Sequence, residues 1–235
     1  STTRMEGRWQ YARDLYGLPG VTRDTIEELN AEFLKRRAAA ASGKSYYRTV
    51  LKEKSRIAVS LLNKVVGNLE CCDRDYFCEV YALNDLIDLR DPVQFEKLSD
   101  KTGIRIHSLE DYAAAVDASI EKALARGAVA LKAAFAYNRP IRFEKVPAAR
   151  AEEELARILA SPSFSDDIGS RMSVSSALED YMIHHVLRFA DRRGLIVQVH
   201  TGLQEGNGNV LANSNPELLT NLFLEYRNVT FDVFH

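Results

Sequence analysis

Hydrophobic and polar positions recur along the chain in two different ways. Residues 1–55 are rich in Arg, Lys, Glu and Ala, and apolar side chains such as Ile26 and Leu29 recur there at helical spacing. Beyond this stretch, short apolar runs alternate with longer amphipathic segments. We therefore predict a helical lid or insert layer over residues 1–55 and a second domain over residues 56–235.

The short apolar runs of the second domain predict β-strands. Both faces of each run are apolar, which is typical of parallel strands whose two faces are covered. The predicted strands comprise residues 56–62, 76–83, 128–134, 195–200 and 229–235.

Helix signals lie between these strands. Ser108 with Asp111, and Ser176 with Glu179, have the spacing of a helix N-cap and its third residue. A weaker helical pattern covers residues 148–160. Gly127 and Gly194 stand where two predicted helices end. Asn215 followed by Pro216 is typical of a helix start.

Alternation of strands and helices predicts an α/β fold with a parallel sheet. Right-handed crossovers leave a doubly wound sheet or a (β/α)₈ TIM barrel as the main choices. No G-x-G-x-x-G follows a predicted strand, which weakens the nucleotide-binding doubly wound alternative. Because a full barrel has eight strands and the sequence predicts five, we expect an incomplete TIM barrel preceded by the helical layer.

Composition narrows the class of protein. A hydrophobic fraction of 46% and a charged fraction of 27% are those of a soluble globular protein. The net charge of −2 predicts neither nucleic-acid nor membrane partners, and the sequence shows no secretory signal and no membrane span. Three cysteines, of which Cys71 and Cys72 are adjacent, make no disulfide framework, so we expect a cytoplasmic protein. The composition leaves open whether the chain forms a homo-oligomer.

Polar side chains end three of the apolar strands. If branched apolar residues face the helices, alternation turns Lys132, His200 and His235 inward, near the carboxyl ends of their strands. Phe231 would then face inward with His235, and Asp232 would face outward and require a helix-borne partner. Two imidazoles beside a buried amine favour a divalent metal, with Zn²⁺ the first choice.

Each of these residues also has an ordinary explanation. A single histidine at a strand end is more often a buried histidine with satisfied hydrogen bonds than a metal ligand, and this holds for His200 and for His235 separately. Lys132 could be an ion-pair partner, a contact for a substrate anion or a neutral nucleophile. His184 and His185, on a predicted amphipathic helix, are expected to pack or hydrogen-bond rather than to bind metal.

Loops after the strands supply candidate substrate contacts. The planar guanidinium of Arg139 suits a carboxylate or phosphate, although a plain surface arginine is an equal alternative. Glycines in the loop after His200 let the backbone approach a ligand closely. The predicted substrate-binding residues are Tyr137, Arg139, Gln204, Asn207 and Asn209.

The segments "VQVHTGLQEGNGN" and "NSNPELLTNLFLEYRNVTFDVFH" resemble the amidohydrolase superfamily, in its amidohydrolase-2-like branch related to uronate isomerases. The resemblance covers residues 128–235. It implies a metal-dependent (β/α)₈ barrel whose second to sixth strands are those predicted above. It also implies that His200 and His235 are the fifth- and sixth-strand metal ligands. Lys132 matches a fourth-strand lysine that is carboxylated in some members and bridges two metals.

Two features of that family's site are missing here. The sequence contains no H-x-H pair, and it ends before a strand carrying the family's aspartate. We therefore expect an interior portion of a longer enzyme, which would bind its one or two ions weakly by itself. The predicted function is a metal-dependent hydrolase that acts on a small polar, carboxylate-bearing substrate through metal-activated water. The alternatives are a uronate-isomerase-like isomerase or decarboxylase, and a non-catalytic binding protein derived from a barrel.

Overall fold

In the computed structural model, the described residues are 10–40, 47–63, 73–161, 176–204 and 210–234. The chain divides into two compact units, one of residues 1–60 and 73–77 and the other of residues 61–72 and 78–235.

The first unit is helical where it is described. Residues 10–16 are helical, α2 extends over Ile26–Ala40, and a π-helix extends over Arg48–Lys54. Its core is small and consists of Ala12, Tyr16, Leu18 and Leu29. The helical character agrees with the sequence pattern, whereas the role of a lid stays a prediction.

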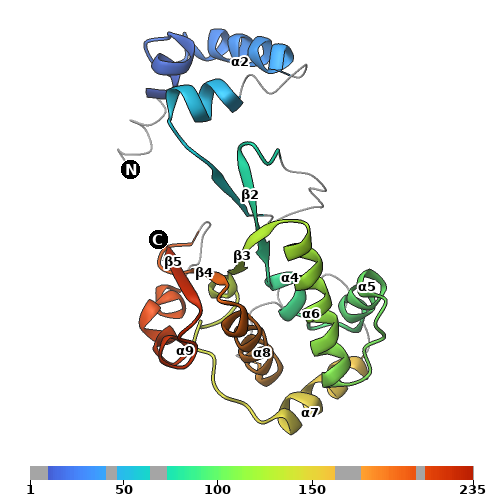
Figure 1. Ribbon diagram of the computed structural model, residues 1–235. Helices are drawn as coiled ribbons and strands as arrows, with labels where there is room; N and C mark the ends of the chain where they lie inside the picture. The colour runs from blue at the N-terminus through green and yellow to red at the C-terminus, as the bar shows by residue number, and fades with distance from the viewer. Residues whose placement is uncertain (1–9, 41–46, 64–72, 162–175, 205–209, 235) are drawn as a thin grey trace. The chain divides into compact units, whose positions relative to one another are not determined.

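The second unit contains most of a five-stranded sheet (Figure 1). Its strands are hydrogen-bonded in sequence order, and the pairs β2–β3, β3–β4 and β4–β5 are parallel. A doubly wound sheet would reverse its strand order, so the observed order is that of a barrel wall and the fold is a five-stranded half-barrel. The strands are β1 Ser60–Asn63, β2 Phe77–Ala82, β3 Ala128–Ala133, β4 Ile196–His200 and β5 Thr230–Phe234.

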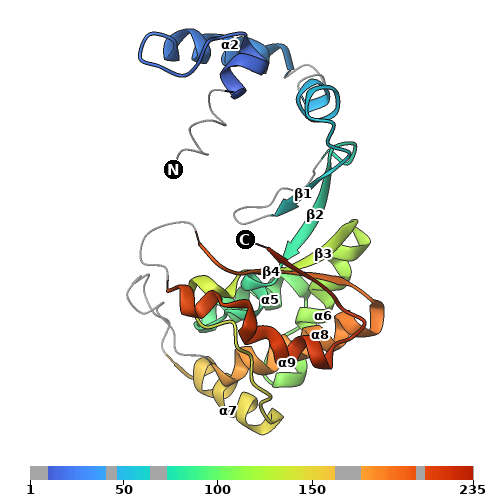
Figure 2. The ribbon, with the colours of Figure 1, turned by 90° about the vertical axis from the view of Figure 1, so that its left-hand side faces the viewer.

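Helices follow the strands along the chain, and α6, α8 and α9 lie on one side of β3–β5 in both views (Figures 1 and 2). None of the described helices is long and apolar enough to cross a membrane. The α-helices are α4 Asn84–Ile87, α5 Pro92–Thr102, α6 Leu109–Ala125, α7 Ala148–Leu159, α8 Ala177–Arg193 and α9 Thr220–Glu225. Short 3₁₀ helices are η2 Phe135–Tyr137, η4 Leu211–Ser214 and η5 Pro216–Leu219.

Helix starts follow the caps read from the sequence. The Ser108 hydroxyl accepts a hydrogen bond from the Asp111 amide at 3.1 Å, and the Asp111 carboxylate accepts one from the Ser108 amide at 3.0 Å. A hydrogen bond with the Ser108 side chain, followed by bonds from the His107 and Ser108 amides, holds the pKa of the Asp111 carboxyl below its usual value. Asn215 caps the 3₁₀ helix η5 rather than α9 directly, and α5 begins at a second capping box that the predicted helices did not include.

Replacing Ser108 by Ala is expected to lower the free energy of unfolding by about 1 kcal/mol, because the amide of the third helical residue loses its partner. Urea unfolding followed by circular dichroism measures this. Glu110→Gln is the matched control, since Glu110 is exposed in the same turn and takes no part in the cap. Equal midpoints for the two variants would contradict the role of the cap.

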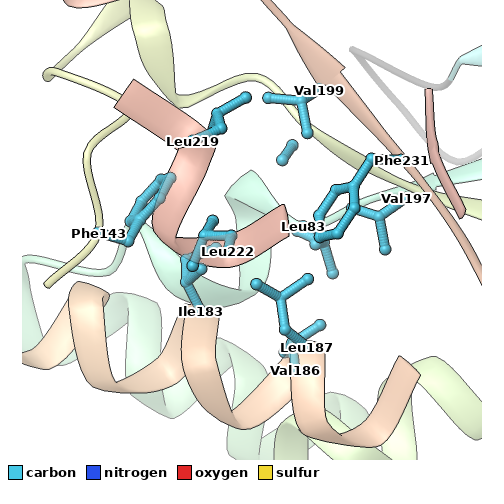
Figure 3. Close-up of a pocket in the computed structure, with 11 residues that line it drawn as sticks. Leu83, Phe143, Ile183, Val186, Leu187, Val197, Val199, Leu219, Leu222 and Phe231 are labelled. Atoms are coloured by element: carbon cyan, nitrogen blue, oxygen red, sulfur yellow. The ribbon is translucent and has the colours of Figure 1, made fainter. Parts of the chain in front are cut away.

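One face of the sheet packs on the helices around an apolar pocket (Figure 3). Val197, Val199 and Phe231 of the sheet face Ile183 and other residues of α8 and α9. Every lining side chain is apolar, so this pocket belongs to the core and offers no polar group to a substrate. The full lining is Leu83, Ala133, Phe143, Ile183, Val186, Leu187, Val197, Val199, Leu219, Leu222 and Phe231.

Candidate functional site

The other face of the sheet carries a row of polar residues across three strands. Lys132 of β3 is in register with Gln198 of β4, which is in register with Asp232 of β5. Residues in register on parallel strands point to the same face. The Gln198 side-chain amide donates to the Asp232 carboxylate at 2.7 Å, so these two residues of the row are hydrogen-bonded as well as aligned.

This row corrects the predicted faces of the fifth strand. Phe231 was expected to point inward and Asp232 outward, but Phe231 packs against the helices and Asp232 faces the same way as Lys132. The partner of Asp232 is Gln198 on the neighbouring strand, not a helix residue. The assignment failed because β5 is apolar on both sides of its single carboxylate, and alternation by itself does not say which set faces the helices.

His200 lies at the carboxyl end of β4 on the face of Lys132. It is 8% exposed and in register with Phe234, whose ring centroid is 5.5 Å from that of His200. On its other side the ring of Tyr137, from η2, has its centroid 5.0 Å away. Tyr137 is half exposed, so its ring contacts both the buried imidazole and solvent. Tyr137, one of the predicted substrate-binding residues, therefore lies beside His200 in the structure.

Lys132 is almost fully buried, with 1% of its surface exposed. Its ammonium nitrogen makes no hydrogen bond to any of the described residues and lies 3.1 Å from the centroid of the Phe234 ring. Burial lowers the pKa of Lys132 from 10.5 to about 8, and the Asp232 carboxylate partly opposes this shift. The amine is therefore mostly protonated at pH 7, but it loses its proton, and becomes a nitrogen donor, at a lower pH than an exposed lysine does.

Lys132→Met is expected to stabilise the metal-free protein at pH 7. Below about pH 8 the lysine is charged in both states, so the folded state carries the full cost of burying the charge. That cost shrinks as pH rises from about 8 towards 10.5, where the folded lysine is already neutral. The gain should reach up to about 3 kcal/mol at pH 7 and decline towards pH 10.

Chemical denaturation of both proteins in the presence of chelator at several pH values measures that difference. Lys101→Met, at an exposed position on α5, is the matched control and should show no such trend. A stability difference independent of pH would contradict the buried charge.

Arg139 lies in a different environment from the one expected of a substrate contact. It is fully buried, and its guanidinium donates to Glu179 at 2.9 Å and to Asp180 at 2.5 Å. It also donates to the carbonyl oxygens of Pro140 and Arg142. Neither predicted environment, a substrate pocket or a plain surface loop, describes this residue, whose polar atoms contact protein groups.

The two adjacent histidines of α8 contact protein groups, as the sequence predicted. His184 is buried, and its Nδ1 lies 2.6 Å from the Tyr226 hydroxyl. Burial lowers the pKa of His184 below its usual value. The His185 Nε2 lies 2.8 Å from the Asp117 carboxylate of α6. Both residues join α8 to neighbouring elements.

The loop after β4 is only partly described. Gln204 is 5% exposed, and the Gly202 amide donates to the Ser214 carbonyl at 2.9 Å, so the two ends of the loop lie close together. Asn207 and Asn209 lie outside the described residues, and so does His235. The roles predicted for these three residues stay predictions.

The donors that are present fit one side of a metal site. Among the described residues no group of three or more His, Cys, Asp or Glu side chains is placed to hold a metal ion. His200 nevertheless supplies an imidazole, and Lys132 on the adjacent strand supplies a buried amine to the same face. The Lys132 amine has no hydrogen-bond acceptor among the described residues. Zn²⁺ accepts nitrogen donors readily, and a full set would require further ligands.

Comparison with solved structures identifies the architecture. A protein provisionally named a metal-dependent hydrolase, from Lactobacillus casei ATCC 334, superposes with a TM-score of 0.60 and 17% identity over 83% of this chain and 49% of its own. Glucuronate isomerase from Caulobacter crescentus superposes with a TM-score of 0.60 and 14% identity over 98% and 52%. Uronate isomerase from Thermotoga maritima gives 0.61 and 15% over 98% and 56%.

The chain has the fold of these enzymes. It spans about half of the length of each, and identities of 17% or less establish a shared fold and no more. No protein-family model and no curated protein sequence matches it. The resemblance seen in the sequence is thus supported at the level of fold.

Sequence reasoning missed some residues that lie beside this site. Phe234, which contacts both Lys132 and His200, gave no signal, because an aromatic residue in a strand is usually core. Asp232 did give a signal, as the single charge in an apolar strand. Asn84, whose side-chain oxygen accepts from the Ala134 amide at 3.0 Å at the end of β3, could have been found from its place directly after the second strand.

Proposed function

We propose that this chain forms part of a metal-dependent enzyme of the amidohydrolase type, which acts on a small polar substrate. The observation that carries the proposal is the buried amine of Lys132, which has no hydrogen-bond acceptor among the described residues and lies on the face and at the strand ends where His200 lies. Barrels of this kind place their active sites at the carboxyl ends of the strands. A buried amine without a hydrogen-bond acceptor is costly in a purely structural role.

In this proposal His200 and His235 would hold the metal, and Lys132 would be a third ligand or, if carboxylated, a bridge between two ions. The role of His235 rests on the family resemblance, because Phe231 packs on the helices and strand alternation no longer assigns His235 to the face of Lys132. A divalent metal such as Zn²⁺ would supply Lewis-acid chemistry, polarising a substrate carbonyl or lowering the pKa of water. Phe234 shields the Lys132 amine from water, and Asp232 lies close enough to favour its protonated form. Tyr137 is half exposed beside His200, and we propose that its phenol hydrogen-bonds a polar substrate there.

Fewer observations support the choice of substrate than support the metal. Arg139 no longer supports a substrate carboxylate, because it is committed to Glu179 and Asp180. Gln204, Asn207 and Asn209 remain proposed contacts. A carboxylate-bearing substrate is instead favoured by the two uronate isomerases that share the fold, since a uronate is a sugar acid. The same neighbours favour isomerisation as the second candidate reaction.

The test uses the full-length gene product, stripped with chelator and reconstituted with Zn²⁺, Mn²⁺ or Fe²⁺. Each form is assayed for hydrolysis of N-acyl amino acids and lactones, for decarboxylation of small carboxylic acids, and for conversion of uronates to ketoses. We expect turnover only after reconstitution, and its loss in His200→Ala. His185→Ala is the matched control and should keep activity. Folded protein that turns over none of these with any metal would favour a binding protein instead.

A further inference from the structure

A network of ion pairs surrounds the buried guanidinium of Arg139, apart from the residues proposed to bind metal. Arg139 joins Glu179 and Asp180, and Arg90 joins Glu179 at 2.8 Å and Asp88 at 2.6 Å. These contacts connect three segments: the loop after α4, the loop after β3 and the first turn of α8. We call Asp88, Arg90, Asn138, Arg139, Glu179 and Asp180 the Arg139 cluster.

The charges of this cluster are arranged to hold one geometry. Two guanidinium groups face three carboxylates, and two of these, Glu179 and Asp180, lie in the first turn of α8, where the helix dipole favours negative charge. Burial raises the pKa of both carboxyls, and the guanidinium of Arg139 opposes that rise. Buried ion pairs are weak sources of stability, because desolvation offsets the attraction, so a geometric role accounts better for such a network.

The cluster reaches the candidate site through consecutive residues. Asn138 follows Tyr137 directly, and its side chain donates to the Asp88 carboxylate at 2.5 Å. The amides of Asn138 and Arg139 both donate to the carbonyl of Phe135, which is itself buried. The backbone on the carboxyl side of Tyr137 is therefore fixed at two successive residues.

Tyr137 needs such support from its neighbours. Its ring is 47% exposed, so burial alone does not fix its position against His200. Further along, the Ile141 amide donates to the Asn213 carbonyl at 2.9 Å, which ties the same loop to the segment after β4. The backbone that follows Tyr137 is thus held at Asn138, Arg139 and Ile141.

We infer that the Arg139 cluster is a clamp that sets the position of Tyr137 against His200, and that Asn138 and Arg139 are positioning residues of the candidate site. This inference rests on the proposed function only in taking His200 as a site residue. The geometry it concerns, the 5.0 Å separation of the two ring centroids, is measurable without any substrate or metal.

The test is nuclear magnetic resonance of histidine-labelled full-length protein without metal. Tyr137→Leu first gives the displacement of the His200 ring-proton resonances that removing the Tyr137 ring current causes. Asn138→Ala and Arg139→Lys are then expected to move the same resonances in the same direction by a comparable amount. Asn138→Ala removes the hydrogen bond to Asp88 and leaves every charge in place, so it keeps the test valid if Arg139→Lys does not fold.

Controls separate the clamp from general loosening. Arg126→Lys alters an ion pair with Glu79 that lies outside the cluster, and it should leave the His200 resonances unmoved. The resonances of His185, which pairs with Asp117, should stay fixed in all variants. Unmoved His200 resonances in folded Asn138→Ala would overturn the clamp. A different outcome would count against the proposed function alone: the wild type binds no metal, but the variants still move the His200 resonances as expected.

Discussion

His200→Ala is expected to lower the affinity of the full-length protein for Zn²⁺ by about 100-fold or more. Removing groups that merely support a metal ligand costs 10–100-fold, and His200 is proposed as a ligand itself. The remaining donors, Lys132 among them, would bind the ion without the imidazole that shares their face. Competition with a chromogenic chelator measures the affinity of wild type and variant.

A matched variant makes this result specific. His185→Ala also removes an imidazole, but from α8, where it pairs with Asp117. Its Zn²⁺ affinity should equal that of the wild type, and His235→Ala should behave like His200→Ala. Equal affinities for all four proteins would show that His200 holds no metal.

Arg139→Met is expected to cost about 3–5 kcal/mol in the free energy of unfolding, because it leaves Glu179 and Asp180 buried without their main partner. Both carboxyls already have raised pKa values, and Arg139 is what opposes that rise. The loss should therefore be smaller at acidic pH, where the carboxyls of the variant take up protons. Urea unfolding at pH 5 and pH 7 tests both parts of this expectation.

Arg142→Met is the control for this effect. Arg142 lies three residues away with an exposed side chain that pairs with exposed Glu144, so its loss should cost at most about 1 kcal/mol. If the two arginine variants unfolded at the same denaturant concentration, the large loss of unfolding free energy predicted for Arg139→Met would be wrong.

Much of the fold could be predicted because its signals are local. The five strands and the caps at Ser108 and Ser176 depend on residues close together in sequence. The structure has both caps and a strand at each predicted place, although β1 begins at Ser60 and not at residue 56. The capping box of α5, with Asp91 and Gln94, was equally readable but was not used. Strand order followed from the alternation of strands and helices.

The candidate site was predicted less completely, because its environment depends on distant residues. Arg139 was expected at a substrate, but its partners Glu179 and Asp180 lie 40 and 41 positions further along the chain. The inward face of β5 was assigned wrongly, because Phe231 and Phe234 are both aromatic and only pairing with β4 distinguishes their faces. Lys132 and His200 were placed together because both end strands that neighbour each other in sequence and in the sheet.

Anomalous diffraction from crystals of the full-length protein, recorded at the absorption edge of the bound metal, tests the central claim most directly. We expect a peak on the sheet face that carries Lys132 and His200, about 2.0–2.1 Å from an imidazole nitrogen of His200 if the ion is Zn²⁺. Crystals grown with the metal that show no peak on this face, or a peak only among surface residues, would contradict a metal-dependent site here.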